Sequence, residues 1–319
     1  MSLTRASIIR GPAVIIYTPQ GGSPVNLFSQ GDIQVRIGNQ TFDINTSLFG
    51  VVDKRTQQRS VEITFTPTGE LTTAMAAVLW PHGSKNPGDS LIGAGNPQIQ
   101  IVPKTGYSYI FYGAVVTKQP QVNLASTKTI VGPITFTAIG KEGVLWSTAA
   151  SLYTEAVTSF GSYAFTASSI RTCPYSGVWG SSELSVVDTK DGWTIDFNVA
   201  TTPVEADAYG LVDYTVGDNV ATATCTPLTI SETSLTALLK LQGAGTDRGQ
   251  SLLSGNNLVV TPTTGTPVGS ANVTLSNCII LQVGYDYGLN SLRIPQVQFT
   301  TMRYLLASVL QSAYTITVN

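Results

Sequence analysis

Charged side chains are scarce in this sequence: Asp, Glu, Lys and Arg make up 11% of its 319 residues, against roughly 25% in typical soluble domains. Serine, threonine, asparagine, glutamine and glycine fill their place. A polar but uncharged surface suits a protein that is largely covered by copies of itself, and it equally suits a β-rich secreted binding protein. The formal net charge of −2 supplies no excess of basic residues to neutralise phosphates, which argues against a dedicated nucleic-acid binder.

Histidine is nearly absent, and this restricts the chemistry available. The one histidine, His82, excludes HExxH and other sites with several histidine ligands. The sequence has no GxSxG, no GxxxxGK[ST] and no GxGxxG after a strand. Paired carboxylates could in principle hydrolyse glycosides, but the acidic residues lie mostly in polar loops, and Asp188, Asp191 and Asp196 lack the EF-hand spacing. We therefore expect no enzyme, no catalytic residue, no cofactor and no metal.

Cysteine is also rare. The three cysteines, Cys173, Cys225 and Cys278, are odd in number and without CxxC spacing, which predicts free thiols in a reducing compartment. Cys225 and Cys278 lie in strand-like runs and are expected to be small core residues, with a bridge between them left open. Residues 1–20 do not resemble a signal peptide, and no apolar run approaches the ~20 residues of a membrane-spanning helix.

What the sequence does contain is an internal repeat. Gly50-Val51-Val52-Asp53 recurs 160 residues later as Gly210-Leu211-Val212-Asp213, and Thr66-Pro67 recurs at the same shift as Thr226-Pro227. A repeat of this length indicates duplication of a whole domain. A second match, Thr41-x-Asp43-x-Asn45 with Thr194-x-Asp196-x-Asn198, has a shift of 153 and predicts about seven extra residues before Gly210. We predict domains at 1–146 and 163–319, joined by a connection at 147–162.

Alternation of apolar and polar residues dominates both copies, as in Val61–Phe65, Gln98–Ile101 and Tyr314–Val318, and predicts strands with one buried face. Two helical patterns, Glu70–Trp80 and Glu232–Leu241, follow the two Thr-Pro pairs. The fold class is therefore mainly β: two tandem antiparallel β-sandwich or barrel domains, each with one flanking α-helix.

Two long segments of opposite charge stand at equivalent places in the two copies. Both are expected to be loops, and long loops in a compact β domain are often functional. The first, Thr46–Ser60, is basic, and the second, Ala200–Asn219, is acidic. Residues 1–150 contain 11 Lys and Arg against 7 Asp and Glu, and residues 151–319 contain 6 against 12. Such a difference favours alternating neighbours in an assembly, although drift between copies would also produce it. The charged residues of the two segments are Lys54, Arg55 and Arg59, and Glu205, Asp207, Asp213 and Asp218.

The matched order of strand, Thr-Pro, helix, strand and strand resembles the tail tube proteins of long-tailed bacteriophages, and is similar to the tube proteins of contractile injection systems and type VI secretion. The resemblance spans Gly31–Glu142 and Ser182–Arg303. It implies copies of a small β domain in a ring around a channel. Members with two such domains in one chain form trimers that imitate hexamers, so this chain resembles that kind.

The resemblance further implies a virion tail protein assembled in the host cytoplasm. Its homotrimeric rings would stack into a tube, and DNA would pass through the lumen without specific binding. Tape-measure, tail-tip and tail-terminator proteins would be its partners, and the two charged loops are the candidates for contacts between subunits and for stacking. A single ring at the tail tip or neck is the alternative within the family.

A two-domain β-sandwich adhesin or carbohydrate-binding protein is the alternative from another class. Exposed aromatic rings would be needed to bind sugars, although the alternation in residues 107–112 predicts that most of the tyrosines pack on a sheet face. A glycosidase with paired carboxylates is a weaker alternative. The aromatic candidates are Trp179, Trp193, Tyr107, Tyr109 and Tyr112.

Overall fold

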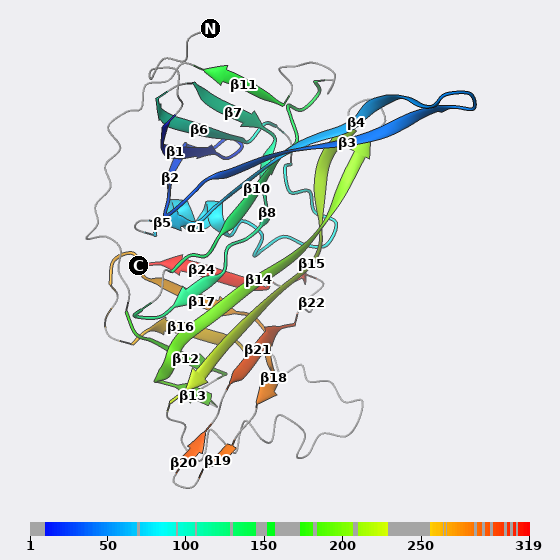
Figure 1. Ribbon diagram of the computed structural model, residues 1–319. Coiled ribbons are helices and arrows are strands. Elements are labelled where there is room, and N and C mark those ends of the chain that lie inside the picture. The colour runs from blue at the N-terminus through cyan, green and yellow to red at the C-terminus, as the bar shows by residue number, and fades with distance from the viewer. Residues whose placement is uncertain are drawn as a thin grey trace.

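The computed structural model of the chain is mainly β, with one helix among the residues that it describes (Figure 1). Four larger sheets are arranged in a ring that resembles a propeller, and two small hairpins accompany them. The strand pairings in the described part of the chain are antiparallel, as the alternating sequence predicts. The structure describes residues 10–68, 71–93, 95–105, 107–127, 130–144, 152–156, 173–180, 184–206, 210–228, 256–263, 265, 267–283, 286–288, 291–293, 296–302, 305–306, 309–310 and 312–319.

Sheets A and B are built from the first half of the sequence. Sheet A has the order β11-β7-β6-β1-β2-β5 and sheet B the order β3-β4-β10-β8. Their strands are β1 (Arg10–Thr18), β2 (Val25–Ser29), β3 (Gln34–Thr46), β4 (Gly50–Phe65), β5 (Pro67–Thr68), β6 (Gln98–Thr105), β7 (Ser108–Tyr112), β8 (Ala114–Lys118), β10 (Ile134–Ala138) and β11 (Tyr153–Ala156).

Sheets C and D come from the second half, except for one strand. Sheet C has the order β18-β21-β15-β14-β9 and sheet D the order β13-β12-β16-β17-β24. Their strands are β9 (Val122–Leu124), β12 (Tyr175–Trp179), β13 (Leu184–Val186), β14 (Thr189–Ala206), β15 (Gly210–Pro227), β16 (Leu258–Pro262), β17 (Ala271–Leu275), β18 (Cys278–Val283), β21 (Val297–Thr301) and β24 (Tyr314–Val318). The small hairpins pair β19 (Asp286–Gly288) with β20 (Ser291–Arg293), and β22 (Leu305–Leu306) with β23 (Val309–Leu310).

The two pairs of sheets share one topology. The order β11-β7-β6-β1-β2 in sheet A corresponds to β24-β17-β16-β12-β13 in sheet D, and β8-β10-β4-β3 in sheet B corresponds to β18-β21-β15-β14 in sheet C. The duplication read from the sequence is thus a duplication of a pair of sheets. We call sheets A and B the first sheet pair, and sheets C and D the second sheet pair.

The prediction of two tandem domains is wrong in one respect, because the two sheet pairs do not form separate bodies. Strand β9 comes from the first half but pairs with β14 of the second half, from Val122↔Ile195 to Leu124↔Trp193. The buried side chains of both halves also form one continuous core. Apolar surface lies between the halves, so the ring of sheets folds around a shared interior.

Strand register fixes how the copies correspond. In the first hairpin Thr46 pairs with Gly50 and Val35 with Ile63, and in the second Ala206 pairs with Gly210 and Ile195 with Ala223. The shift of 160 residues therefore applies along both strands of the hairpins, with β-bulges at the same places. The predicted shift of 153 and the predicted seven extra residues before Gly210 are therefore wrong. The match of Thr41, Asp43 and Asn45 with Thr194, Asp196 and Asn198 is a chance similarity, because polar residues recur at every second position of an alternating strand.

Helix α1 (Thr73–Leu79) begins three residues after the predicted start. The Thr72 hydroxyl caps it by accepting a hydrogen bond from the Met75 N–H at 3.2 Å. Val78 and Leu79 are buried, and Pro81 follows its end. The predicted second helix, Glu232–Leu241, lies outside the described residues. No described helix has both the length and the apolar character needed to cross a membrane.

Candidate assembly surface

The two charged segments predicted to be loops are the outer parts of two long β-hairpins. In Figure 1 the hairpin of β3 and β4 projects from the body of the molecule, and the hairpin of β14 and β15 extends beside its base. We call the hairpin of β3 and β4 the first arm and the hairpin of β14 and β15 the second arm. Lys54, Arg55 and Arg59 lie on β4. A hairpin satisfies the backbone hydrogen bonds of both strands by itself, so the chain can extend away from the core.

The first arm exposes apolar side chains that a stable free surface would avoid. Strand β3 is exposed on both faces along nearly its whole length. Ile37 is 62% exposed and Phe49, in the hairpin turn, is 76% exposed. We call the exposed apolar side chains of the first arm the apolar arm surface; its members are Val35, Ile37, Phe42, Leu48, Phe49, Val51 and Val52. Sequence reasoning missed this surface because the alternation of apolar residues does not distinguish a covered strand from an open one.

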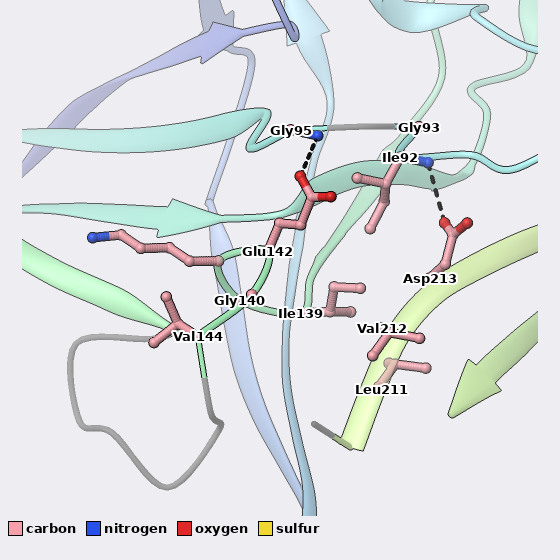
Figure 2. A pocket seen from close by; sticks show the side chains of 12 residues that line it. Ile92, Gly93, Gly95, Ile139, Gly140, Glu142, Val144, Leu211, Val212 and Asp213 are labelled. Atoms are coloured by element: carbon pink, nitrogen blue, oxygen red, sulfur yellow. Dashed lines mark hydrogen bonds between the residues drawn. The ribbon is translucent and has the colours of Figure 1, made fainter. Parts of the chain in front are cut away.

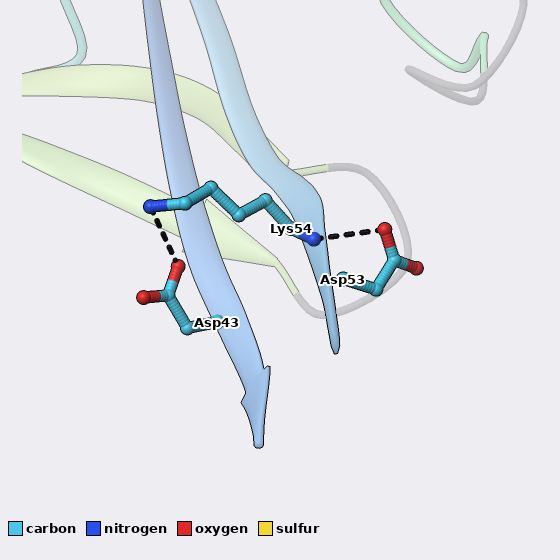
Figure 3. A network of polar contacts seen from close by, with 3 residues as sticks. All are labelled: Asp43, Asp53 and Lys54. Atoms are coloured by element: carbon cyan, nitrogen blue, oxygen red, sulfur yellow. Dashed lines mark hydrogen bonds and ion pairs between the residues drawn. The ribbon is translucent and has the colours of Figure 1, made fainter. Parts of the chain in front are cut away.

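The charged residues of the first arm pair mostly with one another. Figure 3 shows Lys54 between two carboxylates: its Nζ lies 3.1 Å from Asp43 Oδ1 across the strands, and its backbone N–H donates to Asp53 Oδ1 at 2.8 Å. Arg55 Nε lies 3.6 Å from Asp53 Oδ2. Exposed pairs of this kind contribute only about 0–1 kcal/mol to stability, so their charges remain open to a partner.

The predicted acidic residues that the structure describes lie on the second arm. Glu205 is on β14, Asp213 and Asp218 are on β15, and Asp207 is outside the described residues. Asp213 repeats the geometry of Asp53, because its Oδ1 accepts the N–H of the next residue at 2.7 Å. Unlike Asp53, it also accepts the Ile92 N–H at 3.2 Å. The structure thus places these acids in one arm, where Asp213 anchors a contact with the first half.

Residues 88–92 of the first half lie along β15 and pair with it through one isolated antiparallel bridge. The Leu91 N–H donates to Tyr214 O at 2.8 Å, the Val216 N–H donates to Asp89 O at 2.9 Å, and Ser90 faces Thr215. Strand β4 also contacts β15. Burial raises the pKa of the Tyr214 phenol, and the carboxylates of Glu62 on β4 and Glu205 raise it further. The second arm is therefore held by the first half.

A hollow of about 250 Å³ lies beside Ile92, where the contact between residues 88–92 and β15 ends (Figure 2). Its apolar wall includes Ile92, Ile139 and Leu211, from both halves. Its two carboxylates are used to hold loops: Glu142 Oε2 accepts the Gly95 N–H at 2.6 Å, and Asp213 accepts that of Ile92. The hollow thus belongs to the junction of the two halves.

The turn after α1 forms the centre of that junction. Trp80 packs against Phe197 of β14, with ring centroids 6.2 Å apart, and Phe197 packs against Tyr314 of β24 at 4.4 Å. The Tyr314 hydroxyl hydrogen-bonds to the Gln119 side chain at 2.6 Å. The Asn219 side-chain amide donates to the His82 carbonyl at 2.5 Å. These contacts join residues far apart in sequence into one buried polar and aromatic cluster.

His82 is a structural residue of this cluster. Its side chain is 2% exposed, and Nε2 lies 2.7 Å from the Val116 carbonyl. Desolvation by burial lowers the pKa of its imidazole to about 4, and the Lys85 charge lowers it further against the opposing hydrogen bond. His82 is thus neutral near pH 7.

The three cysteines are free, as predicted, and the predicted burial of Cys225 and Cys278 is confirmed; Cys173 is buried as well, and Cys225 and Cys278 are not bridged. Burial raises the pKa of the Cys225 thiol to about 12 and that of Cys278 as well, so both thiols are inert core groups.

The aromatic candidates for sugar binding do not form one platform. Trp179 and Trp193 are 2% and 1% exposed, and Lys141 lies 4.2 Å from the centroid of the Tyr112 ring. Tyr109 is half-buried, and only Tyr107 is exposed. Most of these rings pack within the fold, as the alternation predicts.

Within the described part of the chain, no three His, Cys, Asp or Glu side chains come together in a way that could hold a metal ion. Asp188, Asp191 and Asp196 are all exposed, and Asp196 accepts a hydrogen bond from the Gln121 amide at 2.7 Å.

No model of a known protein family matches the chain. A comparison with curated protein sequences also found no match.

Proposed function

We propose that the protein is a structural virion protein, a subunit of a phage tail tube, and that it is not an enzyme. Each sheet pair is one tube unit of antiparallel β-sandwich type, and the chain carries two. Trimers would form rings with six units, because a head-to-tail contact that repeats around an axis closes into a ring. Stacked rings would enclose a channel through which DNA passes.

The observation that carries the proposal is the apolar arm surface on a chain with duplicated sheet topology. A projecting hairpin with several exposed apolar side chains indicates an interaction site. The scarcity of charge in the whole sequence fits extensive burial between copies. The opposite charges of Lys54, Arg55 and Arg59 on the first arm, and of Glu205 and Asp218 on the second, support alternation of unlike units.

Negative-stain electron microscopy of the purified protein tests the proposal, together with native mass spectrometry. We expect rings of uniform diameter that contain three chains and stack into tubes as concentration rises. Monomers that stay monodisperse at high concentration would contradict it, and binding of those monomers to a glycan array would support the adhesin instead. Rings that never stack would indicate a single ring at the tail tip or neck.

The location of the protein, its partners and its relation to DNA follow from the proposed tube. Assembly would take place in the host cytoplasm, and the finished protein would lie in the virion tail with tape-measure, tail-tip and tail-terminator proteins. The lumen would contact DNA without specific binding, which fits the formal net charge of −2.

A further inference from the structure

The first half covers the second sheet pair at three places within the chain. Strand β9 adds to the outer edge of β14, and residues 88–92 add to β15. The turn after α1 lies on the start of β24, where the Gly83 carbonyl accepts the Ala313 N–H at 3.1 Å. A Cβ on Gly83 would lie 2.7 Å from the Tyr314 carbonyl oxygen, so this contact is close.

The corresponding places on the first sheet pair are uncovered. Strand β3 is the last strand of sheet B, and the described residues supply no strand beyond it, whereas β14 has β9. The side chains at corresponding positions differ accordingly in exposure. Val35 is 42% exposed and Ile195 0%; Ile37 is 62% exposed and Phe197 6%; Val51 is 52% exposed and Leu211 5%; Tyr153 is 39% exposed and Tyr314 2%.

The match of Tyr153 with Tyr314 follows from sheet topology and not from the shift of 160. Tyr153 pairs with Phe111 at the edge of sheet A, and Tyr314 pairs with Leu275 at the same edge of sheet D. Both tyrosines begin the last strand of their sheet and are followed by threonine. The four exposed side chains are therefore the counterparts of side chains that are buried inside the chain.

We propose that these side chains and the open edge of β3 form a surface that binds the second sheet pair of another copy of the same chain, in the way that the second sheet pair is bound within the chain. The intrachain junction is then the template for the contact between subunits. The surface comprises the open edge of β3, the side chains Val35, Ile37 and Val51, and Tyr153. The proposal rests on the proposed ring and names the surfaces that close it.

The second sheet pair offers a strand for the open edge of β3. Strand β9 begins four residues after Lys118 of β8. Strand β18 is the counterpart of β8, and Gln282 of β18 has the place of Lys118. Strand β19 begins four residues after Gln282, so it is the counterpart of β9. Strand β19 pairs on one side with β20, and its other side carries no strand among the described residues. It can add to β3 by β-augmentation.

Polar groups on the first arm fit the same partner. Asp53 accepts the N–H of Lys54 as Asp213 accepts that of Tyr214, and Asp213 uses the same oxygen for the Ile92 N–H. Arg59 occupies the position of Asn219, which donates to the carbonyl of the turn after α1. In the contact between copies, Asp53 can thus accept a hydrogen bond as Asp213 does, and Arg59 can donate one as Asn219 does.

A second copy is favoured over a different protein because the chain already contains one complete example of the contact. The exposed side chains keep the apolar character of their buried counterparts. The contact also uses a different surface on each partner, so it continues from copy to copy until the ring closes.

Substitution at the exposed surface is the first test. Ile37→Glu places a charge on a surface that is open in the free chain, so the chain should fold as before. Burying that charge between copies is unfavourable, and we expect about a tenfold or greater loss of the assembled fraction. Val268→Glu is the matched control, because Val268 is 61% exposed and outside the proposed surface. Equal assembly of the two variants by analytical ultracentrifugation, with unchanged circular dichroism, would overturn the proposal.

Disulfide trapping is the second test. Asn123→Cys with Thr194→Cys should cross-link within one chain, because these residues are partners on β9 and β14. Their counterparts are Gln34 on β3 and the neighbouring residues Asp286 and Tyr287 on β19. Gln34→Cys with Asp286→Cys or Tyr287→Cys should give covalent dimers and trimers on non-reducing gels.

Variants that carry only one of the two introduced cysteines are the controls, and they should not cross-link. Rings without either cross-link would overturn this interface and leave the proposed function standing. Absence of rings in the unsubstituted protein would remove both.

Discussion

The two arms have the same backbone and opposite surroundings. Both are long hairpins with the same register and the same bulges. Yet the second arm buries Ile195 and Phe197, whereas the first exposes Val35 and Ile37. The difference is supplied by neighbours, because the first half of the chain lies against the second arm and nothing in the described chain covers the first arm in the same way. The covered second arm thus shows which kind of neighbour the first arm lacks.

The residue types of the first arm add to this comparison. An edge strand that faces water permanently is usually protected by charged residues or by bulges. The edge strand β3 does carry Arg36 and Asp43, and its register shifts lie between Gln40 and Thr41 and between Ile44 and Asn45. Its inner part, Gln34–Gln40, is regular and exposes the apolar side chains of Val35 and Ile37. This part of the edge is therefore open to pairing.

The largest effect is expected at the junction. Phe197→Ala removes a buried ring that packs against Trp80 and Tyr314, and it should lower the free energy of unfolding by about 3–5 kcal/mol. Ile37→Ala at the corresponding exposed position should change it by less than about 0.5 kcal/mol in the unassembled chain. Urea unfolding followed by tryptophan fluorescence measures both. Similar losses would mean that the two arms are equally buried, and the comparison would fail.

The junction should also respond to pH through His82. Its pKa is lowered from 6.5 to about 4 by burial, so the unfolded chain binds a proton more readily than the folded chain. The free energy of unfolding should therefore fall as pH falls from about 6.5 towards about 4, by roughly 3 kcal/mol in total.

His82 is the one histidine of the sequence, so His82→Gln is a clean control. This variant should lose most of the change between pH 6.5 and pH 5, where carboxylates contribute least. A pH dependence that stays the same in the variant would show that the junction does not bury a titrating imidazole.

The smallest effect on the chain itself is expected from the charges of the first arm. Arg55→Glu with Arg59→Glu should change the free energy of unfolding by less than about 1 kcal/mol, because both side chains are exposed. Assembly should weaken, and the loss should be greater at low salt.

Lys104→Glu with Lys118→Glu makes the same change in net charge at exposed positions on β6 and β8, outside both arms. Light scattering across a salt series compares the two double variants. If both assemble equally well at every salt concentration, complementary arm charges have no role.

Much of the fold could be predicted from local pattern. Alternation located strands such as β6 and β24, and the helical pattern of Glu70–Trp80 located the helix. The repeat of Gly50-Val51-Val52-Asp53 located equivalent points on the two arms. The outer parts of the arms were predicted as loops because their polar residues on both faces lack the alternation that marks a half-buried strand.

The candidate site could be predicted only in part. The charges of Lys54, Arg55 and Arg59 were visible in the sequence, but the apolar surface beside them was not. Val35 and Ile37 look like core residues in sequence, since apolar alternation does not distinguish a strand that is covered from one that is open. Comparison with Ile195 and Phe197 requires the register, which pairing alone fixes.

The sequence by itself determined that this protein is mainly β, that its pattern is written twice, and that the copies differ in charge, because these properties depend on residue type and on spacing along the chain. Tertiary structure alone decided that the two copies share one core, that β9 crosses to the second sheet pair, and that one arm is covered while its counterpart is not. Burial depends on which segments meet in space, and segments such as Trp80 and Phe197 meet only after the whole chain has folded.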